Sequence, residues 1–129
     1  MDKEESVVKK VILIVEDEPK NLKLIQAILQ QNGYTTLEAT NGVQGIELAK
    51  VYQPDLILMD VQMPVMNGPE ATRILKCEPE TQGIPVIALT AYAMETQEEQ
   101  ILQTGYDGYI MKPIRLHEFL QQVAKYLSM

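Results

Sequence analysis

Three short stretches of the sequence are strongly apolar, and they limit the possible fold more than any other feature. They cover Val11–Val15, residues 55–59 and residues 85–89, and they are rich in Val, Ile and Leu. Runs of this length are typical of strands buried on both faces, which occur mainly in parallel sheets. Weaker runs at residues 35–38 and 107–111 predict two further strands. The pattern therefore favours a parallel sheet of five strands.

The segments between these runs have the spacing of amphipathic helices. Between Pro19 and Asn32, apolar residues recur three and four positions apart. Asp17 is predicted to cap this helix, because a short acidic side chain before Pro suits a helix start. Further helices are predicted after Asn41, after Asn67, over residues 94–103 and over residues 116–127. Regular alternation of strands and helices predicts an α/β domain of three layers, with helices on both faces of the sheet.

The length of 129 residues fits a single domain. Residues 1–8 carry mixed charge and no apolar pattern, so we predict a loose N-terminal tail followed by one domain over residues 9–129. The formal net charge of −7 argues against a nucleic-acid surface, which needs clustered Lys and Arg. Cys77 is the only cysteine, which excludes an intrachain disulfide and is typical of a reducing compartment.

No apolar run approaches the roughly 20 residues that a membrane-spanning helix needs. The first residues also lack the basic and apolar regions of a secretory signal. We therefore predict a cytoplasmic protein that binds neither membranes nor nucleic acid.

Chemically useful side chains follow the strongly apolar runs. Glu16 and Asp17 come directly after the first run, Asp60 after the third predicted strand, Thr90 after the fourth and Lys112 after the fifth. Because ligands of open parallel sheets bind at the carboxyl ends of the strands, we expect these side chains to meet at one edge. Any one of them alone is more simply read as a polar loop residue.

Clustered carboxylates repel one another unless a cation lies between them. Mg²⁺ suits such a cluster, because it takes carboxylate oxygens, water and phosphate oxygens as ligands. An Asp beside Mg²⁺ can act as a nucleophile toward phosphorus, and a Lys and a Thr hydroxyl can hold the phosphoryl oxygens. The residue types therefore predict a phosphoryl-accepting aspartate with a metal site.

Four segments of the sequence resemble the receiver domains of two-component response regulators. They are residues 12–18 (ILIVEDE), 56–68 (LILMDVQMPVMNG), 87–91 (IALTA) and 108–113 (GYIMKP). The similarity extends over roughly residues 9–128. It implies the flavodoxin-like (βα)5 fold, a doubly wound α/β arrangement with a five-stranded parallel sheet in the order 2-1-3-4-5.

The resemblance also implies a role for individual residues. Asp60 would be the phosphoacceptor. Glu16, Asp17, Asp60 and the backbone carbonyl of Gln62 would hold Mg²⁺. In many relatives the first acidic position is Asp rather than Glu, and the longer side chain of Glu16 extends the reach to the metal.

The resemblance further implies which residues contact the phosphoryl group and which form the conformational switch. Lys112 would pair with Asp60 and later with the phosphoryl group, and Thr90 would turn its hydroxyl toward the new phosphate. Tyr109 would be the switch aromatic that follows Thr90, and Pro113 would follow a cis peptide bond. The surface formed by residues 94–103, 107–111 and 116–127 would then report the state to a downstream protein.

These roles imply a protein of a two-component phosphorelay. A sensor histidine kinase or a His-phosphotransfer protein would be the phosphodonor, and the chain would be a monomer or a weak homodimer. It would catalyse only its own phosphorylation and dephosphorylation, so it would not be an ordinary turnover enzyme. Both a stand-alone regulator and a receiver taken from a hybrid kinase fit the sequence.

Three other functions use parts of the same pattern. A phosphatase of the haloacid dehalogenase type also has a strand-end Asp, Thr, Lys and Mg²⁺, but its acid–base Asp is replaced here by Gln62. A flavin- or nucleotide-binding protein fits the fold, but the loop Glu16–Pro19 is acidic and lacks a glycine-rich phosphate cradle. An adaptor that works without phosphorylation is the third possibility, although the whole acceptor set is present.

Overall fold

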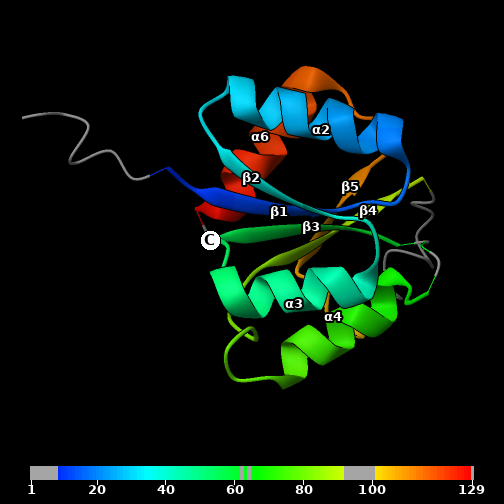
Figure 1. The fold of residues 1–129 in the computed structure, drawn as a ribbon. Helices are drawn as coiled ribbons and strands as arrows, with labels where there is room; N and C mark the ends of the chain where they lie inside the picture. Colours follow the sequence, from blue (N-terminus) through cyan, green and yellow to red (C-terminus); the bar gives the residue numbers. More distant parts are fainter. Residues whose placement is uncertain (1–8, 62, 64, 92–100, 129) are drawn as a thin grey trace, which may run out of the picture.

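A computed structural model describes residues 9–61, 63, 65–91 and 101–128 of the chain. In this part of the chain the protein forms a single sheet of five parallel strands, in the order β2-β1-β3-β4-β5 (Figure 1). The strands are β1 (Val11–Val15), β2 (Thr35–Ala39), β3 (Leu56–Asp60), β4 (Val86–Thr90) and β5 (Gly108–Met111). This arrangement confirms the predicted flavodoxin-like fold and its strand order.

The helices cover both faces of the sheet. They are α2 (Pro19–Gln31), α3 (Gly42–Tyr52), α4 (Gly68–Cys77) and α6 (Leu116–Leu127). Helices α2 and α6 lie on one face, and α3 and α4 lie on the other (Figure 1). Residues 101–104 are also helical, whereas most of the helix predicted over residues 94–103 lies outside the described residues. The tail predicted for residues 1–8 lies outside them as well.

The continuous apolar character of β1 and β3 follows from this three-layer arrangement. Along β1, Ile12 and Ile14 pack into the cluster under α2 and α6, while Leu13 and Val15 pack under α3 and α4. All four side chains are fully buried. Burying a side chain of this size contributes about 1.5–3 kcal/mol relative to exposing it. Each strand therefore stabilises two cores, which fixes its position at the centre of the sheet.

Polar side chains cap the first turns of three helices, and for α2 the capping residue is not the predicted one. Asn41 caps α3 and Asn67 caps α4, each by accepting a hydrogen bond from a backbone N–H three residues later. Helix α2, however, is capped by Glu18, whose side chain accepts from the Lys20 N–H at 2.8 Å. The prediction that Asp17 is the cap was therefore wrong. Because Glu18 caps the helix, the Asp17 carboxylate can take part in other contacts.

The helices of the described residues are all too short or too polar to cross a membrane.

Candidate functional site

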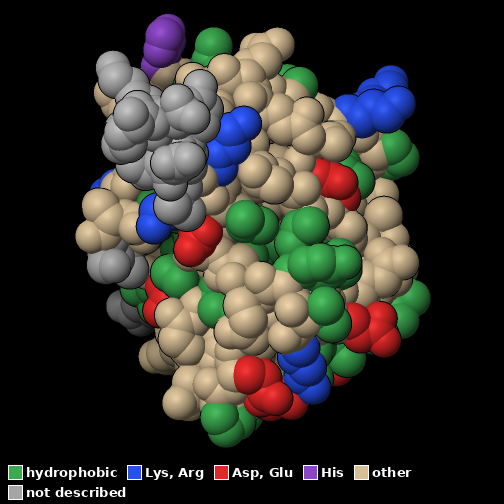
Figure 2. Space-filling view, turned by 60° about the vertical axis from the view of Figure 1, so that its left-hand side comes forward, with side chains coloured by type: hydrophobic (Ala, Val, Ile, Leu, Met, Phe, Trp, Pro, Cys, Tyr) green, Lys and Arg blue, Asp and Glu red, His purple; other side chains and the backbone are tan. Residues whose placement is uncertain are grey.

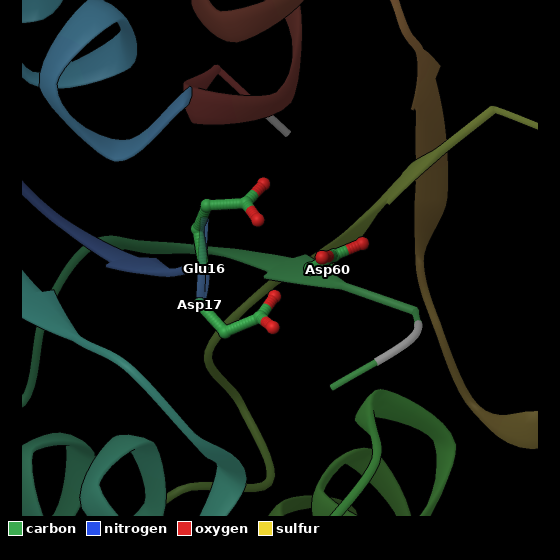
Figure 3. A group of neighbouring side chains, drawn as sticks. All are labelled: Glu16, Asp17 and Asp60. Atoms are coloured by element: carbon green, nitrogen blue, oxygen red, sulfur yellow. The ribbon is translucent and has the colours of Figure 1, made fainter. Parts of the chain in front are cut away.

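Four of the predicted site residues lie close together at the carboxyl edge of the sheet. Glu16 and Asp17 directly follow β1, Asp60 is the last residue of β3, and Lys112 directly follows β5. The strands are in a register that aligns their ends, because Val15 lies opposite Met59 and Asp60 lies opposite Leu89. The three carboxylates point into the same space from two neighbouring strands (Figure 3).

The distances define a compact cluster with the Lys112 ammonium group beside it. One carboxylate oxygen from each of Glu16, Asp17 and Asp60 lies within 4.8 Å of the other two. The Lys112 Nζ lies 2.9 Å from Oε1 of Glu16 and 3.3 Å from Oδ1 of Asp60. Glu16 and Asp60 are buried, and Asp17 is exposed. The cluster thus holds more negative charge than one ammonium group can neutralise.

Glu16 is the most deeply buried member of the cluster, with none of its surface exposed. Its Oε2 accepts a hydrogen bond from the Glu18 N–H at 3.2 Å. None of the described residues donates a hydrogen bond of good angle to its Oε1. The Lys112 ammonium group lies close enough to this oxygen for an ion pair, but its geometry is not that of a hydrogen bond. A buried carboxylate oxygen in this state is destabilising unless a further cation or donor reaches it.

The surroundings of Asp60 make its charged form costly. Burial and the nearby Glu16 carboxylate together raise the pKa of the Asp60 carboxyl from 3.8 to about 6, although the Lys112 ammonium acts to lower it. The same two carboxylates raise the pKa of Lys112, against the opposing effect of its own burial. Lys112 therefore remains charged at neutral pH, and Asp60 is ionised only in part near pH 6.

This pKa predicts how stability depends on pH. Since folded Asp60 binds its proton more tightly than unfolded Asp60, its contribution favours folding at low pH and is lost as the pH rises through about 6. Without divalent cations, Asp60→Asn should therefore be more stable than wild type by about 1–2 kcal/mol near pH 8. The gain should shrink near pH 5, which urea unfolding at the two pH values can measure. An equal or larger gain at the lower pH would contradict this account.

The donor set of the cluster fits a hard divalent cation such as Mg²⁺. All three side chains offer carboxylate oxygens, which are the ligands Mg²⁺ prefers. A positive charge placed between the carboxylates would offset the repulsion between Glu16 and Asp60 that contributes to the raised pKa of Asp60. Gln62, predicted to add a backbone carbonyl, lies outside the described residues.

The other predicted residues lie on β4, on β5 and directly after β5. Thr90 is the last residue of β4 and is 4% exposed, and its carbonyl accepts a hydrogen bond from the Lys112 N–H at 2.7 Å. Tyr109 is a half-buried residue of β5 that packs against the core under α3 and α4. The Lys112–Pro113 peptide bond is cis.

Two residues that sequence reasoning did not select also border Asp60. Gly68 donates its N–H to the Val61 carbonyl at 3.1 Å, which brings the chain after Asp60 back onto itself. A Cβ on Gly68 would overlap both the Asp60 carbonyl oxygen and the Tyr106 hydroxyl. Tyr106 is only 3% exposed, and burial raises its pKa to about 12. The sequence indicated only that a helix begins near Gly68, and nothing marked Tyr106.

The close approach at Gly68 predicts the effect of adding one methyl group. Gly68→Ala should lower the free energy of unfolding by about 1–3 kcal/mol, because the added Cβ would overlap the backbone carbonyl of Asp60 as well as the hydroxyl of the buried Tyr106. It should also weaken Mg²⁺ binding, since the chain beside Asp60 must shift. Urea unfolding and calorimetric Mg²⁺ titration measure the two effects.

Gly83 provides the matched control, because a Cβ at that position has no atom within 4 Å. Gly83→Ala should stay within about 0.5 kcal/mol of wild type. If the two alanine variants were equally stable and bound Mg²⁺ equally well, the packing at Gly68 would not matter.

Comparison with known proteins identifies the family. Residues 12–124 match the model of the response regulator receiver domain. The chain belongs to the receiver domain family of response regulators. It is 44% identical over 119 residues to the polar-differentiation response regulator DivK of Brucella anthropi, covering 92% of this chain and 97% of DivK. This receiver domain is therefore a DivK-like response regulator of two-component signalling.

Solved structures support the same assignment. The receiver domain of a sensor histidine kinase from Pseudomonas aeruginosa is 34% identical, has a TM-score of 0.87 and covers 95% of this chain and 100% of that one. That structure holds a magnesium ion in its active site cleft. Chemotaxis protein CheY4 of Vibrio cholerae, at 24% identity and a TM-score of 0.87, covers 92% of this chain and 99% of its own and shares the fold.

Proposed function

We propose that Asp60 is the phosphoacceptor of this receiver domain and that its phosphodonor is a phosphohistidine. The donor protein would be a sensor histidine kinase or a His-phosphotransfer protein. One observation carries the proposal: the Asp60 carboxylate ends β3 beside two other carboxylates within 4.8 Å and an ammonium group at 3.3 Å. The wider assignment to two-component signalling supports it.

The proposed transfer is a single displacement at phosphorus. An Asp60 carboxylate oxygen forms a bond to phosphorus, and the bond between phosphorus and the donor imidazole nitrogen breaks. The electron pair of that bond goes to the imidazole nitrogen, and the donor leaves as neutral histidine because its other ring nitrogen already carries a proton. The product is an acyl phosphate on Asp60. Lys112, already within ion-pair distance of Asp60, then pairs with a phosphoryl oxygen.

Mg²⁺ would be held by Glu16, Asp17 and Asp60, with the Gln62 carbonyl as a further ligand. When bound, it supplies positive charge that offsets the charge of the phosphoryl oxygens. The chain itself positions the Asp60 nucleophile at the end of a buried strand and keeps the Lys112 ammonium beside it. The fit of the carboxylate cluster to a hard cation supports this part of the proposal.

The signal would leave the site through Thr90 and Tyr109. Thr90 would turn toward the phosphate, and Tyr109 would follow it inward, which shifts a two-state equilibrium. A groove lies between β5 and α6. Its lining includes Tyr109, Met111, Arg115 and Tyr126. This groove supports an output surface formed by β5 and α6, together with the segment before β5.

The domain would act in the cytoplasm as a monomer or a weak homodimer, and it would bind neither nucleic acid nor membranes. It would catalyse only the gain and loss of its own phosphoryl group, without turnover of an external substrate. Incubation with acetyl phosphate and Mg²⁺ tests the proposal: intact mass should show one added phosphoryl group, and an unchanged mass would favour an adaptor that works without phosphorylation.

A further inference from the structure

Val65 is an exposed apolar residue in the segment that follows Asp60. Its side chain is 83% exposed, more than the 71% of Val51 on α3. Its neighbours Met63 and Met66 are partly buried and pack against the core under α3 and α4. Met63 and Met66 therefore turn inward, whereas Val65 lies in solvent, where an apolar side chain gains nothing.

The backbone of Val65 is also strained. Its φ angle is +70°, in the left-handed region that suits Gly and Asn. A β-branched residue in this region is an outlier, because its branched Cβ crowds the backbone. Strain of this kind is retained mainly at functional sites, where a particular side chain is needed at a particular place. Exposure and strain both disfavour valine in the isolated domain, and they are independent of each other.

The position of Val65 places it on the rim of the acceptor site. The hydrogen bond from the Gly68 N–H to the Val61 carbonyl closes the segment that contains it. Gly68 packs against the Asp60 carbonyl. Val65 lies three residues before Gly68, and three residues of extended chain span at most about 11 Å. A protein that brings a phosphohistidine to Asp60 must cover the surface next to this carboxylate.

We infer that Val65 is a docking contact for the phosphodonor protein, and that it fits an apolar patch beside the donor's phosphohistidine. The inference rests on the proposed function and adds the chemistry of the partner surface. Contact with the donor would bury Val65 and remove its cost of exposure, while the strained backbone holds the side chain outward. A small phosphodonor makes no such contact, so Val65 should matter for protein donors alone.

The test compares two donors on two matched variants. Asn adopts the left-handed conformation more readily than Val, so Val65→Asn should keep the backbone while removing the apolar contact. Val51→Asn is the control, because it makes the same change at another exposed valine, on α3. The donors are acetyl phosphate and the purified histidine kinase of the host that phosphorylates the wild-type domain fastest in a transfer profile.

We expect Val65→Asn to slow transfer from the kinase by roughly five- to tenfold and to leave the rate with acetyl phosphate within about twofold of wild type. Its melting temperature should not fall, and Val51→Asn should resemble wild type with both donors. Unchanged transfer from the kinase, or an equal loss with both donors, would overturn the inference. If acetyl phosphate and every kinase failed to modify even wild-type Asp60, the proposed function itself would be wrong and the inference would fall with it.

Discussion

Asp60→Asn should take up no phosphoryl group from acetyl phosphate, whereas the wild-type domain with Mg²⁺ should gain one. The physical reason is that an amide lacks the charged oxygen needed to attack phosphorus and form an acyl phosphate. Neither neighbouring carboxylate is expected to replace it, since Glu16 is fully buried and contacts Lys112, and Asp17 would be a ligand of Mg²⁺. We therefore expect a complete loss, measured by intact mass at increasing donor concentration.

A matched control lies at the opposite end of the same strand. Asp55 precedes β3, and its carboxylate accepts a hydrogen bond from the Val11 N–H at 2.8 Å. Asp55→Asn keeps an acceptor at that position, so it should fold and be phosphorylated like wild type. Phosphoryl gain by Asp60→Asn would identify a different acceptor. Steady release of phosphate from a panel of phosphate esters would instead favour the phosphatase alternative.

Replacing Lys112 with methionine should weaken both the fold and the reaction. Lys112→Met removes the ammonium group that lies 2.9 Å from Glu16 and 3.3 Å from Asp60, and it leaves the two buried carboxylates facing each other. Breaking a buried ion pair costs about 3–5 kcal/mol, and we expect about 2–3 kcal/mol here because part of Lys112 remains exposed to water. Phosphorylation by acetyl phosphate should slow by at least roughly tenfold, as positive charge near the phosphoryl oxygens is lost.

Two conditions separate an electrostatic cause from a loss of packing. Adding Mg²⁺ should recover much of the lost stability of Lys112→Met, because the cation again neutralises the carboxylates. Lowering the pH below about 6 should also reduce the loss, since Asp60 then becomes protonated. Lys125→Met, at an exposed lysine of α6, is the control and should behave like wild type. If neither Mg²⁺ nor pH changed the loss, the contribution of Lys112 would be packing rather than charge.

The strands were the most predictable part of the molecule. The apolar runs at Val11–Val15, residues 55–59 and residues 85–89 agree with β1, β3 and β4 to within one residue. The reason is local: a strand buried on both faces requires an uninterrupted apolar run. The same argument placed Glu16, Asp17 and Asp60 at the carboxyl edge, and the structure brings their oxygens within 4.8 Å.

The helices were predicted less completely, because their contacts depend on neighbours far along the chain. Val43 of α3 and Ile74 of α4 belong to the apolar pattern of their helices, yet 39% and 37% of their surface is exposed. Asp17 was expected to cap α2, but Glu18 provides the cap. In both cases the local pattern was compatible with more than one rotation or start of the helix, and packing against the sheet selected one.

By itself, the sequence determined the fold class, the strand order through its family resemblance and the kinds of side chain that end each strand. Those features follow from local periodicity and from motifs that lie within short segments. The tertiary structure decided the contact of Lys112 with both Glu16 and Asp60, the raised pKa of Asp60, the packing of Gly68 against Tyr106 and the exposure of Val65. These properties depend on distances and burial between segments far apart in the chain, which only the packed domain establishes.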